Sequence, residues 1–325
     1  MKVWRWAGAL CCVAAAVLGV TAYGEQGGTD KPPVFKGFES DKPFYQELTT
    51  TTTQTMKVQG QEVIQKQSQT FLVKWTVKSK AADKWTVDYE IAGVKMNIQI
   101  GGNSIDYSST AEAPPNNPLT DFFKALVGSK FTLTVVNDKD KGLQVTDVDT
   151  KDLENFVNKL AAANEQLKPL LKQILTKDAI IQMSNPTFAA FPSEKQFTDG
   201  KGKWKLPVDL KMGPIGSYDT TYTYELKDKS KVEVSATMKY NPPKTGDSGG
   251  LPFTIKSGNL EAKEPAKGEI NIKDGKIDNS KMTMKLSGKL DIDIAGMSTE
   301  VELNQTQESS LKSFDAEPTT WAKKK

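Results

Sequence analysis

A two-residue alternation of apolar and polar side chains dominates this sequence and limits the folds open to it. Apolar residues recur at every second position in the segments 71–77, 85–91 and 94–100. A strand with this pattern buries one face and exposes the other. One-sided strands are typical of antiparallel sheets, because parallel strands are usually covered on both faces. The alternation therefore predicts a mainly β fold with an antiparallel meander.

Further strands are expected in both halves of the chain, separated by short turn-like segments such as 80–83, 92–93 and 101–103. Pro207 indicates that its strand lies at an edge or is irregular, since proline cannot donate to a ladder. The expected strands cover residues 45–58, 71–77, 85–91, 94–100, 130–136, 143–148, 206–212, 218–226, 232–240, 253–255, 269–273, 282–286, 290–294 and 301–305.

Residues 150–191 show helical spacing instead. Apolar residues recur there at steps of three and four, which places one apolar stripe on a helix. Asp149 or Thr150 is expected to cap the first helix, Pro169 to begin a second, and Thr176 to begin a third. This stripe requires an apolar surface to cover.

About thirteen one-sided strands would leave too large an apolar patch if they formed a flat sheet. We therefore expect an α+β fold that is mainly β: a large curled antiparallel meander sheet, as a half-barrel or barrel. The central helical segment would pack on its concave face as a lid. Two packed sheets are the alternative arrangement.

The start of the chain predicts export. Residues 1–24 combine a positively charged start, an apolar run and the small residues Ala22 and Gly24, a pattern typical of a cleaved signal peptide. The apolar run is too short to span a bilayer, so no integral membrane segment is expected after cleavage. We expect a periplasmic or secreted protein.

The rest of the chain divides into three expected parts. Residues 25–43 are rich in glycine, proline and charge and predict a flexible leader. Residues 44–315 predict a single β-rich domain that contains the helical lid 150–191. Residues 316–325 predict a polar basic tail.

The mature sequence lacks the side chains of most catalytic and metal sites. The chain has no histidine, and its two cysteines, Cys11 and Cys12, and its one arginine, Arg5, lie within the signal peptide. Disulfides, thiolate nucleophiles and histidine-based metal sites or bases are thereby excluded. We expect a protein that is not an enzyme and uses no cofactor or metal.

The charge balance argues against a nucleic-acid partner. The chain has 43 basic and 40 acidic residues, and cleavage after Gly24 removes Lys2 and Arg5, which leaves a net charge of about +1. No field of one sign then exists to attract a polyanion. Protein partners are not indicated by any motif.

Paired carboxylates are the remaining catalytic chemistry, because two of them can hydrolyse glycosides without histidine. Asp88 with Glu90 and Asp291 with Asp293 are candidate pairs. Each pair is spaced by two residues on an expected strand, so both side chains share the polar face. A solvated face is therefore favoured over a carboxylate-based hydrolase.

Inward-facing aromatic and methionine residues are the candidate lining for an apolar small molecule or lipid, since such surfaces suit flexible apolar ligands. The same residues could fill the core of a structural or interaction protein of the cell envelope, and both interpretations stay open. The candidates are Phe71, Trp75, Trp85, Tyr89, Met96, Phe156, Leu160, Leu171, Tyr222, Tyr224, Met238 and Met284.

Several short motifs carry a family resemblance: Val127-Gly128 before Phe131, the pair Phe191-Pro192, and the step from Gly202 to Trp204. With these motifs, residues 44–314 resemble a family of exported bacterial domains of unknown function. The resemblance brings no catalytic residues. The layout also looks like that of the periplasmic lipoprotein-carrier half-barrels, which place an arginine at the cavity mouth.

Cleavage of the signal peptide is directly testable. Mass analysis of envelope fractions should find a chain that begins at Glu25 and carries no lipid. Recovery of the full-length chain as an integral membrane protein would contradict this prediction.

Overall fold

The alternating segments form strands in the computed structural model, which describes residues 31–39, 42–100, 102–112, 118–162, 172, 175–199, 201–211, 215–243, 253–294 and 296–322. The strands are β1 Phe44–Val58, β2 Gln61–Ala81, β3 Lys84–Ile100, β4 Asn103–Ser108, β5 Lys130–Asp138, β6 Gly142–Val148, β7 Lys203–Lys211, β8 Ser217–Leu226, β9 Lys231–Asn241, β10 Thr254–Glu261, β11 Ala266–Lys273, β12 Lys276–Ile294 and β13 Met297–Phe314. The helices are α2 Pro118–Leu126, α3 Thr150–Ala161, α5 Lys177–Ser184 and α6 Glu194–Asp199, with 3-10 turns η3 Asn185–Thr187 and η5 Thr319–Trp321.

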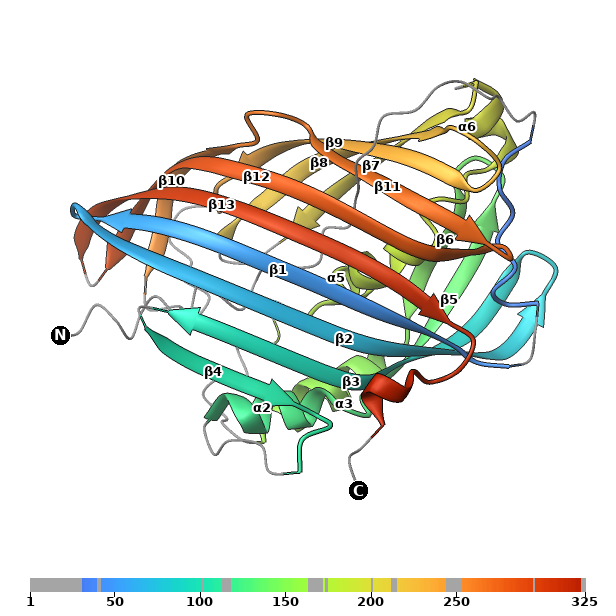
Figure 1. Cartoon of the computed structure of the whole chain (residues 1–325), viewed down its shortest axis with the longest axis horizontal. Coiled ribbons are helices and arrows are strands. Elements are labelled where there is room, and N and C mark those ends of the chain that lie inside the picture. The colour runs from blue at the N-terminus through green and yellow to red at the C-terminus, as the bar shows by residue number, and fades with distance from the viewer. Residues whose placement is uncertain are drawn as a thin grey trace.

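These thirteen strands of the described chain belong to one antiparallel sheet (Figure 1). Its order is β6-β5-β3-β2-β1-β13-β12-β10-β9-β8-β7, with β11 paired to β12 and β9, and β4 paired to β3. The first and last strands, β1 and β13, are neighbours at the centre. The expected curled antiparallel sheet with helices on its concave face is confirmed, and two separate packed sheets do not form.

One expected turn is absent because its strand continues through it. Ala92 and Gly93 lie inside β3, where Gly93 pairs with Leu72 and the register shifts by one residue. A Cβ on Gly93 would lie 2.5 Å from the Trp321 ring, so this glycine leaves space for a side chain and makes no turn. Likewise, the expected strands 282–286 and 290–294 are parts of the single strand β12.

The strands at the two ends of the strand order meet the same helix. Helix α5 contacts both β6 and β7, which are the ends of the strand order. Asn185 Oδ1 accepts a hydrogen bond from the Val145 N–H of β6 at 2.7 Å, and Gln182 Nε2 donates to the Asp209 carbonyl of β7 at 2.6 Å. Residues 177–187, which we call the latch, therefore satisfy backbone groups on both edges. The position of Pro207 in edge strand β7 is also confirmed.

An ion pair accompanies each of these hydrogen bonds. Lys177 Nζ lies 2.5 Å from Asp147 of β6, and Lys211 Nζ of β7 lies 3.2 Å from Asp178 of the latch. The four side chains are 45–61 % exposed, so each pair contributes little to stability. The partly buried Asn185 contact to β6 is the stronger link, because the Gln182 contact to β7 is exposed.

The helix starts agree with their sequence signals. Asp149 caps α3 by accepting from the Lys151 N–H at 2.8 Å, and Thr176 caps α5 by accepting from the Ala179 N–H at 3.2 Å. The second expected helix, beginning at Pro169, lies outside the described residues. The stripe of α3 packs on β5, where the Phe156 and Phe131 rings meet edge to face at 4.9 Å.

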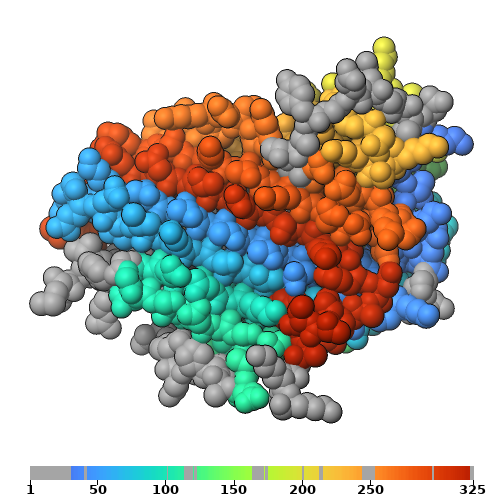
Figure 2. Space-filling model, viewed as in Figure 1, coloured from blue at the N-terminus to red at the C-terminus, as the bar shows by residue number. Residues whose placement is uncertain are grey.

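Residues near both ends of the described chain pack against the sheet. Phe38 lies in the range expected to be a flexible leader, yet it is only 4 % exposed and contacts the rings of the core. Trp321 lies in the range expected to be a polar tail and is also 4 % exposed. Its indole N–H donates to Glu47 at 2.6 Å, and Lys95 lies 4.0 Å above its ring. Figure 2 shows this C-terminal segment in red against the N-terminal strands.

The expected signal peptide, residues 1–24, lies outside the described residues. Among the residues that are described, no helix is long and apolar enough to cross a membrane.

The latch contact to β6 is expected to stabilise the fold measurably. Asn185→Ala leaves the Val145 N–H without its acceptor and should lower the free energy of unfolding by about 1–3 kcal/mol. Asn158→Ala, the same change at an exposed position of α3, is the control and should change it by less than about 0.5 kcal/mol. Equal effects of both changes in urea unfolding would show that the latch does not protect the edge.

Candidate ligand-binding cavity

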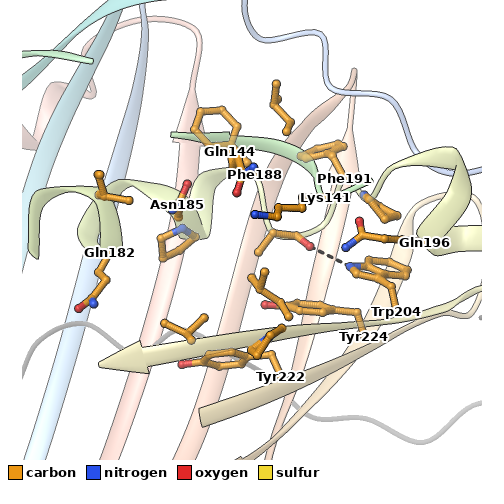
Figure 3. A pocket seen from close by; sticks show the side chains of 18 of the residues that line it. Lys141, Gln144, Gln182, Asn185, Phe188, Phe191, Gln196, Trp204, Tyr222 and Tyr224 are labelled. Atoms are coloured by element: carbon orange, nitrogen blue, oxygen red, sulfur yellow. Dashed lines mark hydrogen bonds between the residues drawn. The ribbon is translucent and has the colours of Figure 1, made fainter. Parts of the chain in front are cut away.

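A cavity of about 330 Å³ lies at the seam where the latch joins the two edges of the sheet. The latch, the segment after it and the strands β6, β7 and β8 supply most of its wall. Lining residues include Leu143, Gln144, Ile181, Gln182, Asn185, Pro186, Phe188, Phe191, Trp204, Leu206, Val208, Tyr222 and Tyr224 (Figure 3).

Three aromatic rings form one continuous side of this cavity. Trp204 of β7 pairs directly with Tyr224 of β8, and their rings stack at 5.4 Å with an interplanar angle of 10°. Tyr222, two residues earlier, places its ring 6.2 Å from that of Tyr224. The indole N–H of Trp204 donates to the Ala189 carbonyl at 3.2 Å, which joins the wall to the segment after the latch.

The aromatic wall is uncharged. Burial raises the pKa of the Tyr222 and Tyr224 hydroxyls well above the ordinary value, so both stay protonated at neutral pH. The charged residues of the cavity lie at its rim, where Asp178 and Lys211 pair with side chains more than half exposed. Lys141 also reaches over the wall from the turn before β6 (Figure 3). The interior wall of this space is therefore mainly apolar, with its charged groups at the rim.

The sequence-based candidates separate into different parts of the structure. Of the twelve, Tyr222 and Tyr224 line the cavity. Phe156 and Leu160 are buried on α3, away from it. Leu171 lies outside the described residues. The structure therefore brings together only part of the predicted lining.

Trp75, Tyr89 and Trp85 belong to a closely packed aromatic cluster. The Trp75 ring lies 4.8 Å from Tyr89 and 5.5 Å from Phe188, and Phe38 lies 6.0 Å from Trp85. The Trp75 N–H donates to Gln46 at 2.9 Å. At this end of the sheet the filled-core interpretation describes the packing.

The other four candidates lie elsewhere on the sheet. Met96 and Met284 are buried, whereas Phe71 and Met238 are half-buried. None of the four lines the seam cavity.

Sequence reasoning missed Trp204, Phe191 and the amides of the latch. Trp204 and Phe191 both lie in motifs that carry the family resemblance, which was the available signal. Gln182 and Asn185 bond to the backbone of β7 and β6. No local sequence pattern predicts that these two strands lie beside the same helix.

The carboxylate pairs are held by lysines on the outer face. Asp88 lies 3.2 Å from Lys78, and Asp293 lies 2.7 Å from Lys256. Neither lines the cavity. Within the described part of the chain, no group of three histidine, cysteine, aspartate or glutamate side chains is arranged to hold a metal ion.

Comparisons with known proteins identify a family. Residues 82–315 match the family of unknown function DUF6263. No curated protein matches the sequence.

Solved structures give only distant likenesses. A lipovitellin structure concerned with lipid–protein interactions is 11 % identical with a TM-score of 0.42, and the alignment covers 88 % of this chain but 27 % of lipovitellin. DynF of Micromonospora chersina is 12 % identical with a TM-score of 0.21, covering 91 % of this chain and 95 % of DynF. OccK5 of Pseudomonas aeruginosa is 8 % identical with a TM-score of 0.25, covering 84 % and 98 %. Scores this low transfer no function.

Buried tyrosines should make the fold sensitive to alkali. The pKa of Tyr222 and Tyr224 is raised by burial, and burial raises that of Tyr240 to about 12. As the pH rises, the tyrosines of the unfolded chain therefore lose their protons before those of the folded chain. The contribution of these tyrosines to the free energy of unfolding is complete below about pH 10 and is lost as the pH rises further. Urea unfolding across this range should show a shallower loss for Tyr224→Phe than for the natural chain. Identical profiles would contradict this assignment.

Proposed function

The chain belongs to DUF6263, a family of unknown function, and we propose that it is a non-catalytic exported protein that binds an apolar or lipid-like molecule in the seam cavity. The observation that carries this proposal is the uncharged aromatic wall of Trp204, Tyr222 and Tyr224. Its rings offer a large apolar contact area whose orientation is held by strand pairing.

The dimensions of the cavity agree with a small ligand or one segment of a longer one. Its volume of about 330 Å³ is at the lower end of the range of about 300–1,000 Å³ for small-molecule sites. Polar groups at the rim, including Gln182 and Lys141, are placed to meet a more polar end of such a molecule. The ligand would thus lie with its apolar part against the aromatic wall.

The latch supplies the entrance in this proposal. It is joined to β7 by an exposed ion pair and the Gln182 contact, so that side can separate from the sheet at low cost. The β6 side is held by the shielded Asn185 contact. Entry of the ligand along β7 would therefore leave the other edge paired.

A second candidate function is a structural or interaction protein of the cell envelope with a filled core. The aromatic cluster around Trp75 favours it, because that end of the concave face is packed with rings. The two candidates differ in whether the seam cavity holds a ligand.

Occupancy of the cavity distinguishes them. Native mass spectrometry of the purified protein should detect a co-purifying apolar molecule, and a fluorescent fatty-acid analogue should bind and be displaced by unlabelled fatty acid. Val208→Trp fills the cavity from β7 and should weaken analogue binding at least about tenfold, a loss of about 1.4 kcal/mol. Lys205→Trp, at an exposed position of the same strand, is the matched control and should bind normally.

Two results would overturn the proposal. If nothing co-purifies and no analogue binds, the filled structural domain is the better description. If the protein turns over an ester, peptide or glycoside and one carboxylate substitution abolishes that turnover, the non-catalytic part is wrong.

A further inference from the structure

Uncharged polar side chains occupy the middle of the concave face, where the pattern of the sheet calls for apolar ones. They stand in two rows across the central strands β13, β1 and β2. We call them the polar grid: Gln307, Thr52 and Gln67 in one row, and Gln305, Gln54 and Gln65 in the next.

Strand pairing places these residues directly opposite one another. Thr52 pairs with Gln307 on one side and Gln67 on the other, and Gln54 pairs with Gln305 and Gln65 in the same way. The grid therefore follows from the register of three neighbouring strands and does not depend on a loop.

Apolar residues border the grid on two sides. Met284 and Leu286 flank it on β12, and Ile98 and Ile100 flank it on β3. Along β1, Met56 lies beyond it at one end, whereas Thr50 at the other end, with its partners Ser309 and Gln69, adds a further polar row before Leu48. The grid is thus part of a polar band that apolar residues of β12 and β3 border.

Five of the six side chains of the grid are buried and Gln305 is half-buried, and the hydrogen bonds among them are poor. Gln65 is 2 % exposed and Gln307 3 % exposed. Gln67 donates to Gln69 at 3.4 Å and Gln307 to Ser309 at 3.4 Å, which are long contacts. The Gln65 side-chain carbonyl has no hydrogen-bond partner among the described residues.

Such an arrangement is costly for a purely structural core. A buried amide without a good partner destabilises a fold, and methionine or leucine at the same positions would avoid that cost. Five glutamines at adjacent inward positions therefore indicate a function that needs amide donors and acceptors.

We propose that the polar grid is a second binding site, which takes an uncharged, hydroxyl-rich group of about the size of one sugar ring. It is separate from the seam cavity and does not depend on a ligand there. Each glutamine offers two N–H donors and one carbonyl acceptor, and hydroxyl groups are the partners that can satisfy both.

The absence of charge in the grid excludes ionic headgroups as its preferred ligand. The intervening residues Lys66, Lys285 and Glu308 are exposed on the opposite face of the sheet. A buried ion would have no counter-ion at the grid and would pay its full desolvation cost.

The grid is large enough for one sugar ring. Strands lie about 4.8 Å apart and alternate residues about 6.7 Å apart, so the six side chains span about 10 Å by about 7 Å. One hexose ring fits this area. It can arrive as a free sugar or as the headgroup of an uncharged glycolipid, whose chain would meet the surrounding methionine, leucine and isoleucine side chains.

Binding of three probes to the mature protein tests this proposal: maltose, octyl β-glucoside below its micelle concentration, and decanoate as a charged amphiphile. Titration calorimetry should show binding of maltose or octyl β-glucoside. Binding of maltose indicates a free sugar, and binding of octyl β-glucoside alone indicates a glycolipid. Failure of both to bind at millimolar concentrations would overturn the proposal.

Variants on β2 locate the binding. Gln65→Met and Gln67→Met keep the side-chain length and remove the amide, so each should weaken sugar binding at least tenfold. Lys66→Met, the same replacement at the intervening outward position, should leave it unchanged. Gln307→Met on β13 provides a test on a second strand if a β2 variant does not fold. Unchanged sugar binding in folded grid variants, or an equal loss of decanoate binding, would contradict an uncharged-sugar site.

Discussion

The unpaired backbone groups at the two ends of the curled sheet are the constraint on which the rest of this structure depends. An open sheet edge exposes a row of N–H and C=O groups that can pair with other chains. This protein brings β6 and β7 to one helix, and the Asn185 and Gln182 amides meet one backbone group on each. The seam cavity exists because a helix and two strand edges leave space where their surfaces do not interlock.

The closure also explains why the aromatic rings take two different forms. Around Trp75, rings from β1, β2, β3 and the segment after the latch converge and fill the space. Around Trp204, the rings lie on the last two strands of the sheet and face the latch, the segment after it and part of β6 across the cavity. Similar residues thus form a solid core near the centre of the sheet and a hollow at its edge.

Much of the fold follows from local sequence patterns, because strands and helix caps depend on neighbouring residues. The alternation in β1, the hairpin of β8 and β9, and the caps Asp149 and Thr176 are all predictable. The continuous strand through Gly93 is not predictable from local patterns. Gly93 is needed there because a side chain would collide with the Trp321 ring, and Trp321 lies 228 positions later in the chain. The cavity could be predicted only in part, through Tyr222 and Tyr224, since its other walls depend on how distant segments meet.

The same limit applies to the concave face. Sequence alternation distinguishes an inward from an outward set, yet it assigns the inward set by its apolar members. Because Thr52 and Gln54 are polar, the alternation does not place them on the inward face. Strand pairing shows that both are buried beside Gln67 and Gln65.

The central pairing of β1 with β13 has a consequence for when the chain can fold. These strands lie at opposite ends of the sequence, with Tyr45 paired to Phe314, so the middle of the sheet cannot assemble until the last residues are available. Pairings between distant segments form slowly, because the entropy of closing a long loop is lost before any contact is gained. A chain that passes through a membrane from its N-terminus would consequently stay without its central strand pair during transit and complete the sheet only on the far side.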